Sequence, residues 1–198
     1  RLLNITGESN DQIENLGSAI TALGNNFATT ESEISRTTTF VASATSQFDV
    51  TAQQVLGLSA AMRSLGQRSE TSGSAIGAAM QSINSAIAEG GESLQTLTEL
   101  TGKSAATIER EFGQNATRVL LDFTRALNDI PAAEQARILD EFGLAGRETT
   151  RVINALASGN EEVARALDMS NQAWRENTAL NEEASKAADT LAGDYQIF

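Results

Sequence analysis

The chain has 198 residues, no cysteine, no histidine and a formal net charge of −12 at pH 7. These features exclude disulfides and thiolate metal sites, remove the commonest general base and metal ligand, and make unspecific binding to nucleic-acid phosphates unfavourable. Only seven Phe, one Tyr and one Trp stand beside abundant Ala, Ser and Thr, so the burial of apolar area stabilises the fold modestly per residue.

Residues 1–10 form a lead-in before the first helical pattern. Because the chain starts at Arg1 and not at a methionine, we expect the sequence to begin inside a longer protein. No signal-peptide pattern opens it. No apolar run approaches the roughly 20 residues that cross a bilayer.

Apolar residues at helical spacing predict a first helix over residues 13–27. A second helix is expected to begin at Thr30, because Thr30 and Glu33 have the spacing of a capping box. Its β-branched residues 37–39 have low helix propensity, so tertiary packing has to hold it. The apolar positions of the two helices are Ile13, Leu16, Ile20, Leu23 and Phe27, followed by Ile34, Val41 and Phe48.

Two amphipathic patterns meet between Val50 and Ile87. Thr51 and Gln54 offer a capping box at the start of the first helix, and Gly66 fits its C-terminal end. We expect two antiparallel helices joined by about half a dozen residues, because a hairpin is the simplest structure that buries both apolar stripes. The stripes consist of Val55, Leu58, Met62 and Leu65, and of Ile76, Met80, Ile83 and Ile87.

We expect Gly90-Gly91 to be a hinge between this region and a short helix that Gly102 closes. Ser104 then opens one long helix that ends near Asp129, and Pro131 suits the first turn of the next helix, up to Gly143. The apolar residues of these helices are Leu94, Leu97 and Leu100; Ile108, Phe112, Val119, Leu120, Phe123 and Leu127; and Ile138, Leu139 and Phe142.

A further helix around Val152, Ile153 and Leu156 ends at Gly159. Asn160 is expected to cap a short helix with Val163 and Leu167. A final helix is expected from about Ser170 to Gly193, with Trp174 near its start and an apolar stripe at heptad-like steps. The stripe consists of Leu180, Ala184, Ala187 and Leu191, and it is too short for a coiled coil unless it continues beyond residue 198.

These patterns predict an all-α fold of about eight to ten helices, arranged in consecutive antiparallel helical hairpins and ending in a longer helix, because no strand pattern of period two occurs. We expect four parts. They are the lead-in over residues 1–10, N-terminal helical hairpins over 11–90, a middle helical subdomain over 91–169, and a C-terminal helix over 170–198 that continues into a longer protein.

The sequence offers few candidates for a chemical site. Four pairs of carboxylates suggest the acid pairs of glycosidases, but each lies on a predicted exposed face, which favours solvation. Trp174 is a candidate anchor for a partner, although packing within the chain is the stronger interpretation. The glycines at 73, 77, 90 and 91 follow no strand and lack the lysine of a phosphate-binding loop. The carboxylate pairs are Glu31/Glu33, Asp140/Glu141, Glu161/Glu162 and Glu182/Glu183.

The run GLSAAMRSLGQRSETSGSAIGAAMQSI, from Gly57 to Ile83, resembles the core region of phage tail tape-measure proteins. In that family, a Gly-Leu-Ser start, a Leu-Gly helix end, an acidic residue and a Ser/Thr-Gly pair precede another helix. Residues 16–26 and the segment that ends in residues 140–143 match as well, in the order expected. The resemblance covers most of residues 10–160.

The matching residues occupy packing and capping positions, so the resemblance implies a role without an active site. It implies a structural, non-enzymatic segment of a longer protein that sets tail length and templates the tail tube. The implied partners are other copies of the chain, the tail-tube protein and tail-assembly chaperones. The implied location is the lumen of the virion tail tube, after assembly in the cytoplasm of the bacterial host.

We therefore expect no catalytic residue, metal site or cofactor in this segment, no direct binding of nucleic acid and no membrane segment. One alternative is a helical module for protein–protein interaction, an adaptor without a viral role. An enzyme that cleaves cell walls is a further alternative, and it requires an acid pair in a cleft.

Overall fold

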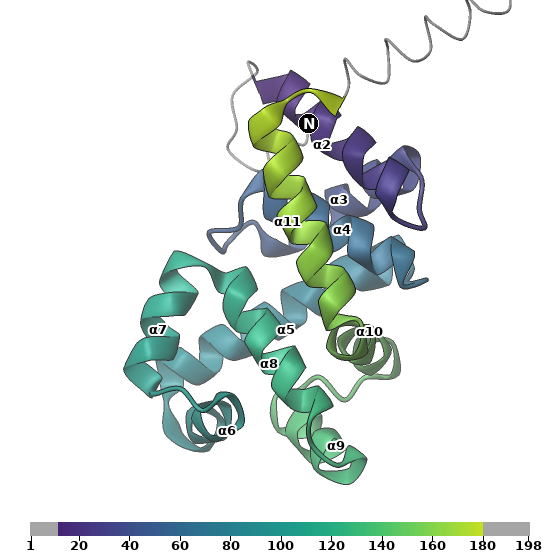
Figure 1. The fold of residues 1–198 in the computed structure, drawn as a ribbon. Coiled ribbons are helices and arrows are strands. Elements are labelled where there is room, and N and C mark those ends of the chain that lie inside the picture. The colour runs from purple at the N-terminus through teal and green to yellow at the C-terminus, as the bar shows by residue number, and fades with distance from the viewer. Residues whose placement is uncertain (1–11, 180–198) are drawn as a thin grey trace, which may run out of the picture.

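The computed structural model describes residues 12–179, which form ten α-helices and no strand (Figure 1). The predicted all-α fold is confirmed. The helices are α2 (Ile13–Asn26), α3 (Glu31–Thr45), α4 (Ala52–Ser64), α5 (Ser69–Glu89), α6 (Gly91–Thr101), α7 (Ala105–Gln114), α8 (Ala116–Asn128), α9 (Ala132–Glu141), α10 (Arg147–Ser158) and α11 (Asn160–Glu176).

Local hydrogen bonds fix the helix starts that the sequence predicted. Thr30 and Glu33 form a capping box at α3, and Thr51 and Gln54 form one at α4. In the second box, the Thr51 amide donates to Gln54 Oε1 at 3.0 Å. Gly66 follows the end of α4 with a φ of +72°, a conformation that glycine adopts without the strain of a Cβ atom. These predictions are confirmed.

The long helix expected from Ser104 to Asp129 is two helices, so that prediction was wrong. Ser104 caps α7 as expected, but the chain leaves helical geometry at Asn115, where φ is −161° and ψ is 82°. The Asn115 side chain accepts hydrogen bonds from the Arg118 amide and from Gln54 Nε2. By leaving the helix at Asn115, the chain provides an N-cap for α8 and a contact with α4, and a continuous helix would have neither.

The C-terminal boundaries also differ from the prediction. Residues 160–176 form one helix, α11, in which Ser170 is buried and Trp174 lies near the end. Asn160 is its first residue, and Gly159 occupies the N-cap position. The helix stops at Asn177, which has a φ of +51°. Ser170 lies inside this continuous helix, and its hydroxyl donates to the Gln53 carbonyl at 2.8 Å, which links α11 to α4. The lead-in and the stripe from Leu180 to Leu191 lie outside the described residues.

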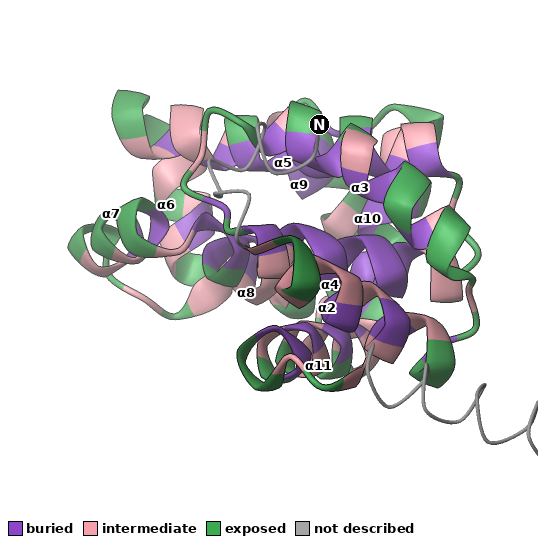
Figure 2. Cartoon of the chain, turned by 90° about the horizontal axis from the view of Figure 1, so that it is seen from above, coloured by how far each residue is buried: buried purple, intermediate pink, exposed green. Residues whose placement is uncertain are grey.

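α4 is the central helix. Every residue from Val55 to Met62 is buried, although the sequence pattern predicted a single apolar face. α11 packs on one side of α4, α3 packs on another and α2 contacts it as well, so α4 lies between α11 and the layer of α3 and α5 (Figure 2). A helix that is surrounded in this way requires small or apolar residues on all sides, which the sequence AQQVLGLSAAM supplies.

The expected hairpin of α4 and α5 is not the main packing unit. The two helices are joined by a short loop and contact each other, but α5 packs chiefly on α3 and then on α10. Four further helices, α6, α7, α8 and α10, also contact α5. The ring pairs Phe48–Phe112 and Phe123–Phe142 pack in this part of the core. α9 joins this region through the buried side chains of Ile138, Leu139 and Phe142.

The threonines of α3 show how packing holds a helix of low propensity. Thr37 and Thr38 are fully buried. Their hydroxyls donate to the carbonyls of Glu33 and Ile34, four residues earlier, at 2.8 and 2.7 Å. Each buried hydroxyl is thereby satisfied inside its own helix, which leaves the methyl groups free to pack against neighbours.

Candidate functional site

The most extensive helix contact in the described chain is between α3 and α5. Helix α5 contains most of the Gly57–Ile83 segment that resembles tape-measure proteins. The two helices run parallel, because contacts advance together along both: Thr37 with Ser69, Phe40 with Gly73, and Ala44 with Gly77. Gln47 and Gln81 continue the series with a side-chain hydrogen bond of 2.8 Å.

Glycine makes this approach possible. A Cβ atom at Gly73 would lie 2.7 Å from the carbonyl carbon of Phe40, and one at Gly77 would lie 2.8 Å from the Cβ of Ala44. Real Cβ atoms do not come this close to backbone atoms. At the first residue of α5, before the two glycine contacts, the hydroxyls of Thr37 and Ser69 share a buried hydrogen bond of 2.8 Å. The α3–α5 contact is therefore backbone against backbone.

A second close contact joins α4 to α11, in the antiparallel direction. A Cβ atom at Gly57 would lie 2.8 Å from the Cα of Leu167. Ser64, at the end of α4, donates to Glu162 Oε1 near the start of α11 at 2.8 Å. Gly57 opens the Gly-Leu-Ser motif, so this motif residue marks a packing position.

None of the four glycines considered for phosphate binding forms a phosphate loop. Gly73 and Gly77 lie inside α5 and contact α3. Gly90 and Gly91 have positive φ values, near +70°, at the turn from α5 to α6. Gly73 and Gly77 therefore allow close helix packing, and Gly90 and Gly91 allow the turn between two helices.

The described carboxylate pairs are not assembled into an acid dyad. Glu33 binds Arg63 and the Thr30 amide, and these hydrogen bonds, that of Arg63 first, lower the pKa of its carboxyl. Glu141 binds Arg137 at 3.1 Å, and Glu162 binds Arg165 at 2.7 Å. The other members of these pairs, Glu31, Asp140 and Glu161, are exposed. Glu182 and Glu183 lie outside the described residues.

One ion cluster was missed by reasoning from the sequence. Lys103 Nζ lies 2.6 Å from Asp122 Oδ2 and 2.5 Å from Glu111 Oε2, and all three side chains are at least three-quarters buried. Hydrogen bonds to Asp122 and Glu111 raise the pKa of Lys103, and the bond to Lys103 lowers the pKa of Glu111. The cluster joins the loop before α7 to α7 and α8. No local pattern reveals it, because its members are 8 and 19 residues apart.

Trp174 lies inside the chain and is only 6% exposed. Asn15 Nδ2 donates to its backbone carbonyl at 2.7 Å, which ties α2 to the end of α11. The ring therefore packs in the core, as the stronger interpretation of the sequence held, and is not available to anchor a partner.

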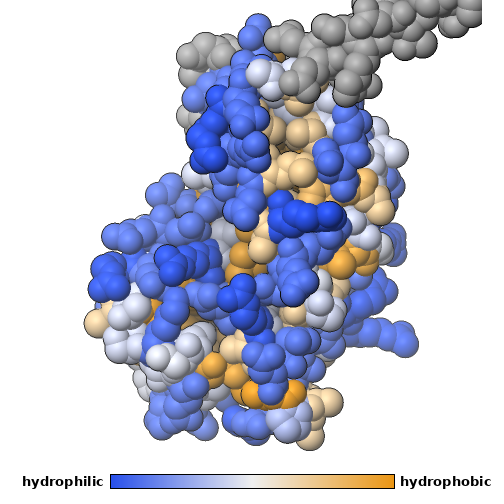
Figure 3. Space-filling model, in the orientation of Figure 1, coloured by the Kyte–Doolittle hydropathy of each residue, from blue (hydrophilic) through white to orange (hydrophobic). Residues whose placement is uncertain are grey.

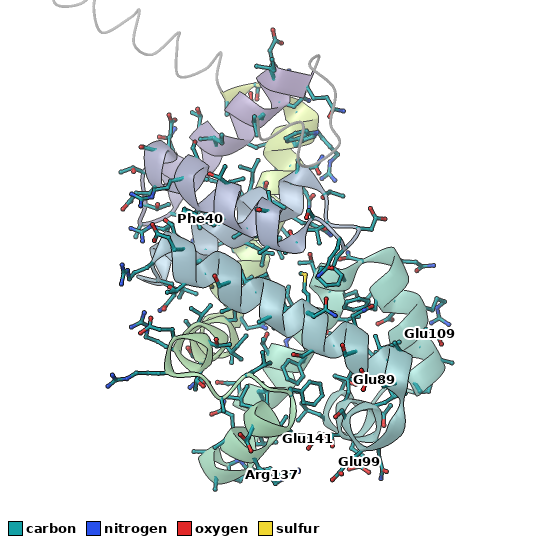
Figure 4. All side chains as sticks on the ribbon, turned by 180° about the vertical axis from the view of Figure 1, so that it is seen from behind. Phe40, Glu89, Glu99, Glu109, Arg137 and Glu141 are labelled. Carbon is teal, nitrogen blue, oxygen red and sulfur yellow. The ribbon has the colours of Figure 1, made fainter. Side chains whose placement is uncertain are left out.

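The surface offers shallow polar depressions. One lies between α5 and α9, with Ser82, Glu89 and Glu141 in its wall, and another between α6 and α9, with Glu92, Glu99 and Arg137 (Figure 4). Within residues 12–179 there is no group of three or more acidic side chains placed to hold a metal ion, and no helix is both long and apolar enough to span a membrane. The face in Figure 3 is mostly hydrophilic, with smaller hydrophobic patches.

The close contacts at Gly57, Gly73 and Gly77 are packing contacts between helices. A family model described as "phage-related minor tail protein" matches residues 1–143. This range includes α2 to α9, and with them both helices that carry the Gly57–Ile83 run. Among curated proteins and among solved structures, none matches the chain significantly.

Proposed function

The chain belongs to the family of phage-related minor tail proteins, and from this premise we propose that it is a segment of a tail tape-measure protein. Membership makes the chain a structural component of the phage tail. The proposal goes further: this segment adds to the length over which the tail tube polymerises, and it does so without catalysis.

The observation that carries the proposal is the position of the Gly57–Ile83 run in the fold. Its glycines at 57, 73 and 77 are the points where α4 meets α11 and where α5 meets α3. Its other residues are mostly buried alanine, serine and apolar side chains. The buried residues of the segment that resembles tape-measure proteins thus serve helix packing, which supports a geometric role.

We propose that the segment contributes length in proportion to its number of residues, because a helix rises about 1.5 Å per residue. Its partners in this role are the tail-tube protein, tail-assembly chaperones and other copies of the chain. Its place is the lumen of the tail tube, and it assembles in the bacterial cytoplasm. The net charge of −12 favours a basic surface on these partners.

In-frame deletions in the phage gene test whether the segment contributes to tail length. We propose that the segment lies in the tail as one extended helix. Removing residues 91–114, which are α6 and α7, is then expected to shorten tails by about 36 Å, and removing residues 91–141, α6 to α9, by about 77 Å. Tail lengths are measured by electron microscopy of purified virions.

The matched control changes the fold without changing the number of residues. Gly73→Leu forces a large side chain against the backbone of Phe40 and is expected to disturb the α3–α5 contact. Tail length is expected to stay unchanged, because the number of residues is unchanged. Tails of unaltered length in both deletion mutants, or tails shortened equally by the two, would contradict the proposal.

A further inference from the structure

Helix α6 has the fewest buried residues of the ten described helices. Only Leu97 is buried among its 11 residues, whereas each of the other described helices buries at least two. The other two leucines of its apolar stripe, Leu94 and Leu100, are partly buried. Because packing stabilises a helix in proportion to the apolar area that it buries, α6 gains little free energy from its contact with the rest of the fold.

The side-chain hydrogen bonds of α6 all stay inside the helix. Gln95 donates to Glu99 Oε1 at 2.8 Å, and the hydroxyls of Thr98 and Thr101 donate to carbonyls three and four residues earlier, both at 2.7 Å. Within residues 12–179, no side chain of α6 forms a hydrogen bond or an ion pair with another element. Packing alone therefore attaches the side chains of α6 to the fold.

Helix α9, which has a similar length, is attached by more contacts. Its 10 residues include two buried side chains, Ile138 and Leu139. The carbonyl of its C-cap residue, Phe142, accepts a hydrogen bond from the Ser82 hydroxyl at 2.8 Å, and the Phe142 ring packs on Phe123. These contacts link α9 to α5 and α8, and α6 has no equivalent of them in the described chain.

Glycines with positive φ flank α6 on both sides. The φ values are +70° at Gly90, +71° at Gly91 and +68° at Gly102. A Cβ atom at any of the three would meet nothing within 4 Å, so these positions need glycine for its backbone conformation and not for space. Glycine populates positive and negative φ about equally, so the backbone rotates more easily at these points. The glycine pair that the sequence predicted to be a hinge thus has a counterpart at Gly102.

The chain is held in place immediately beyond these glycines. Glu89 is the last residue of α5, which packs on α3 and α10. Lys103 follows Gly102 and forms ion pairs with Glu111 of α7 and Asp122 of α8. A movement of α6 therefore does not require a movement of α5, α7 or α8.

A depression borders α6 on the side toward α9. Its wall includes Glu92 and Glu99 of α6 and Arg137 of α9, and Figure 4 shows Glu99 and Arg137 on their two helices. The helices on which α6 packs are α5, α7 and α8. Solvent therefore reaches α6 on the side that faces α9.

We propose that residues 90–102 form a flap that opens as one unit, by rotation at Gly90-Gly91 and at Gly102, while the other described helices stay folded. Opening removes Leu97 from its buried position. Because isolated helices of fewer than about 12 residues are marginal in water, α6 loses its internal hydrogen bonds once it has left the fold. Its amide hydrogens therefore exchange together, at a free energy below that of global unfolding.

The flap is a property of the folded chain and does not depend on the tape-measure role. One consequence does rest on the proposed function: in a conversion to the extended helix of the tail, the compact fold opens first at α6. Measurements on the purified chain test the flap, whereas tail lengths test the role in the tail, so the two fail separately.

Hydrogen exchange of the 198-residue chain, followed by mass spectrometry in increasing low concentrations of urea, tests the flap. The amides of residues 94–101 are expected to exchange at least about tenfold faster than the buried amides of α5, because they need only the local opening. Their rates are expected to depend little on urea, since the opening exposes little surface, whereas the α5 rates rise with urea. Equal rates and equal urea dependence in the two helices would exclude independent opening of α6.

Two leucine truncations separate local opening from global unfolding. Leu97→Ala is expected to speed exchange in α6 by about thirtyfold or more, because it destabilises the closed flap. Leu139→Ala is the matched control, since Leu139 is 2% exposed in α9 and Leu97 is fully buried. This control is expected to leave exchange in α6 within about threefold of the unsubstituted chain. If the two variants speed exchange in α6 equally, α6 opens only with the whole fold, and the proposal is wrong.

A glycine substitution tests the hinge. Alanine at position 102 strains the closed flap, where φ is +68°, and rotation on opening relieves the strain, so Gly102→Ala is expected to speed exchange in α6 about tenfold. Gly66→Ala introduces the same strain after α4, where φ is +72°, and is expected to leave exchange in α6 unchanged. No effect of Gly102→Ala, or an equal effect of the two variants, would overturn the proposal, because the flap requires rotation at Gly102.

Discussion

Gly73 of α5 lies against the backbone of Phe40 in α3, so closely that a Cβ atom would stand 2.7 Å from the Phe40 carbonyl carbon and 2.8 Å from its oxygen. The contact belongs to a parallel pair of helices that the chain reaches by way of α4. It explains why a flexible residue is found in the interior of a helix of 21 residues.

Gly73→Ala is expected to destabilise the fold by about 1–3 kcal/mol, because the backbones of α3 and α5 have to separate. This occurs although alanine has a helix propensity better than glycine by roughly 1 kcal/mol. Gly113→Ala is the matched control: Gly113 lies in α7 with nothing near its missing Cβ, so the same substitution is expected to stabilise by about 0.5–1 kcal/mol. Urea unfolding followed by circular dichroism measures both. If the free energy of unfolding changes in the same direction in both variants, the close contact does not contribute to stability.

Thr117→Val is expected to maintain or raise stability. The Thr117 hydroxyl is buried and has no hydrogen-bond partner among the described residues, and valine has nearly the same shape without the polar group. Thr38→Val is the comparison, since the Thr38 hydroxyl donates to the Ile34 carbonyl at 2.7 Å. The two free energies of unfolding are expected to differ by about 1 kcal/mol in favour of Thr117→Val. A larger loss at Thr117 than at Thr38 would mean that its hydroxyl is bonded in solution.

Asn115→Ala is expected to cost about 1–2 kcal/mol, because the N-cap of α8 is lost and Gln54 loses its acceptor. Gln114→Ala, at the exposed preceding position, is expected to change stability by less than about 0.5 kcal/mol. Thermal unfolding of the two variants provides the measurement. Equal transition temperatures would indicate that the break between α7 and α8 does not depend on the cap.

Acid is expected to weaken the cluster of Lys103, Glu111 and Asp122. The pKa of Glu111 in the folded chain lies below its ordinary value of 4.5. Its contribution to stability is therefore complete above that value and is lost as the pH falls through the lower, folded pKa. The pKa of Lys103 is raised above 10.5, so its contribution holds below that value and is lost as the pH rises through the folded pKa.

Glu111→Gln is expected to reduce the loss of stability between pH 5 and pH 3, measured by urea unfolding at several pH values. Glu109→Gln is the control on the same helix, since Glu109 is exposed and forms no ion pair among the described residues. A pH profile of Glu111→Gln that matches the profile of the unsubstituted chain would exclude the cluster as a source of acid sensitivity.

The sequence alone determined where several helices begin and end. The capping boxes at Thr30 and Thr51 and the glycine after α4 depend on groups within about four residues of one another, so short patterns contain all that is needed. The apolar spacing also determined the all-α class. The break at Asn115 was missed because its second hydrogen bond comes from Gln54, 61 residues earlier.

Only the tertiary structure decided which helices became neighbours. Stripes of glycine, alanine and serine on α4 and α5 fit several partners equally well, and the parallel pairing of α3 with α5 was settled by backbone contact at Gly73 and Gly77. The burial of Trp174 and the cluster at Lys103 follow from the same arrangement. The physical reason is that packing free energy depends on the complementarity of whole surfaces, whereas a helix end is fixed by a few local hydrogen bonds.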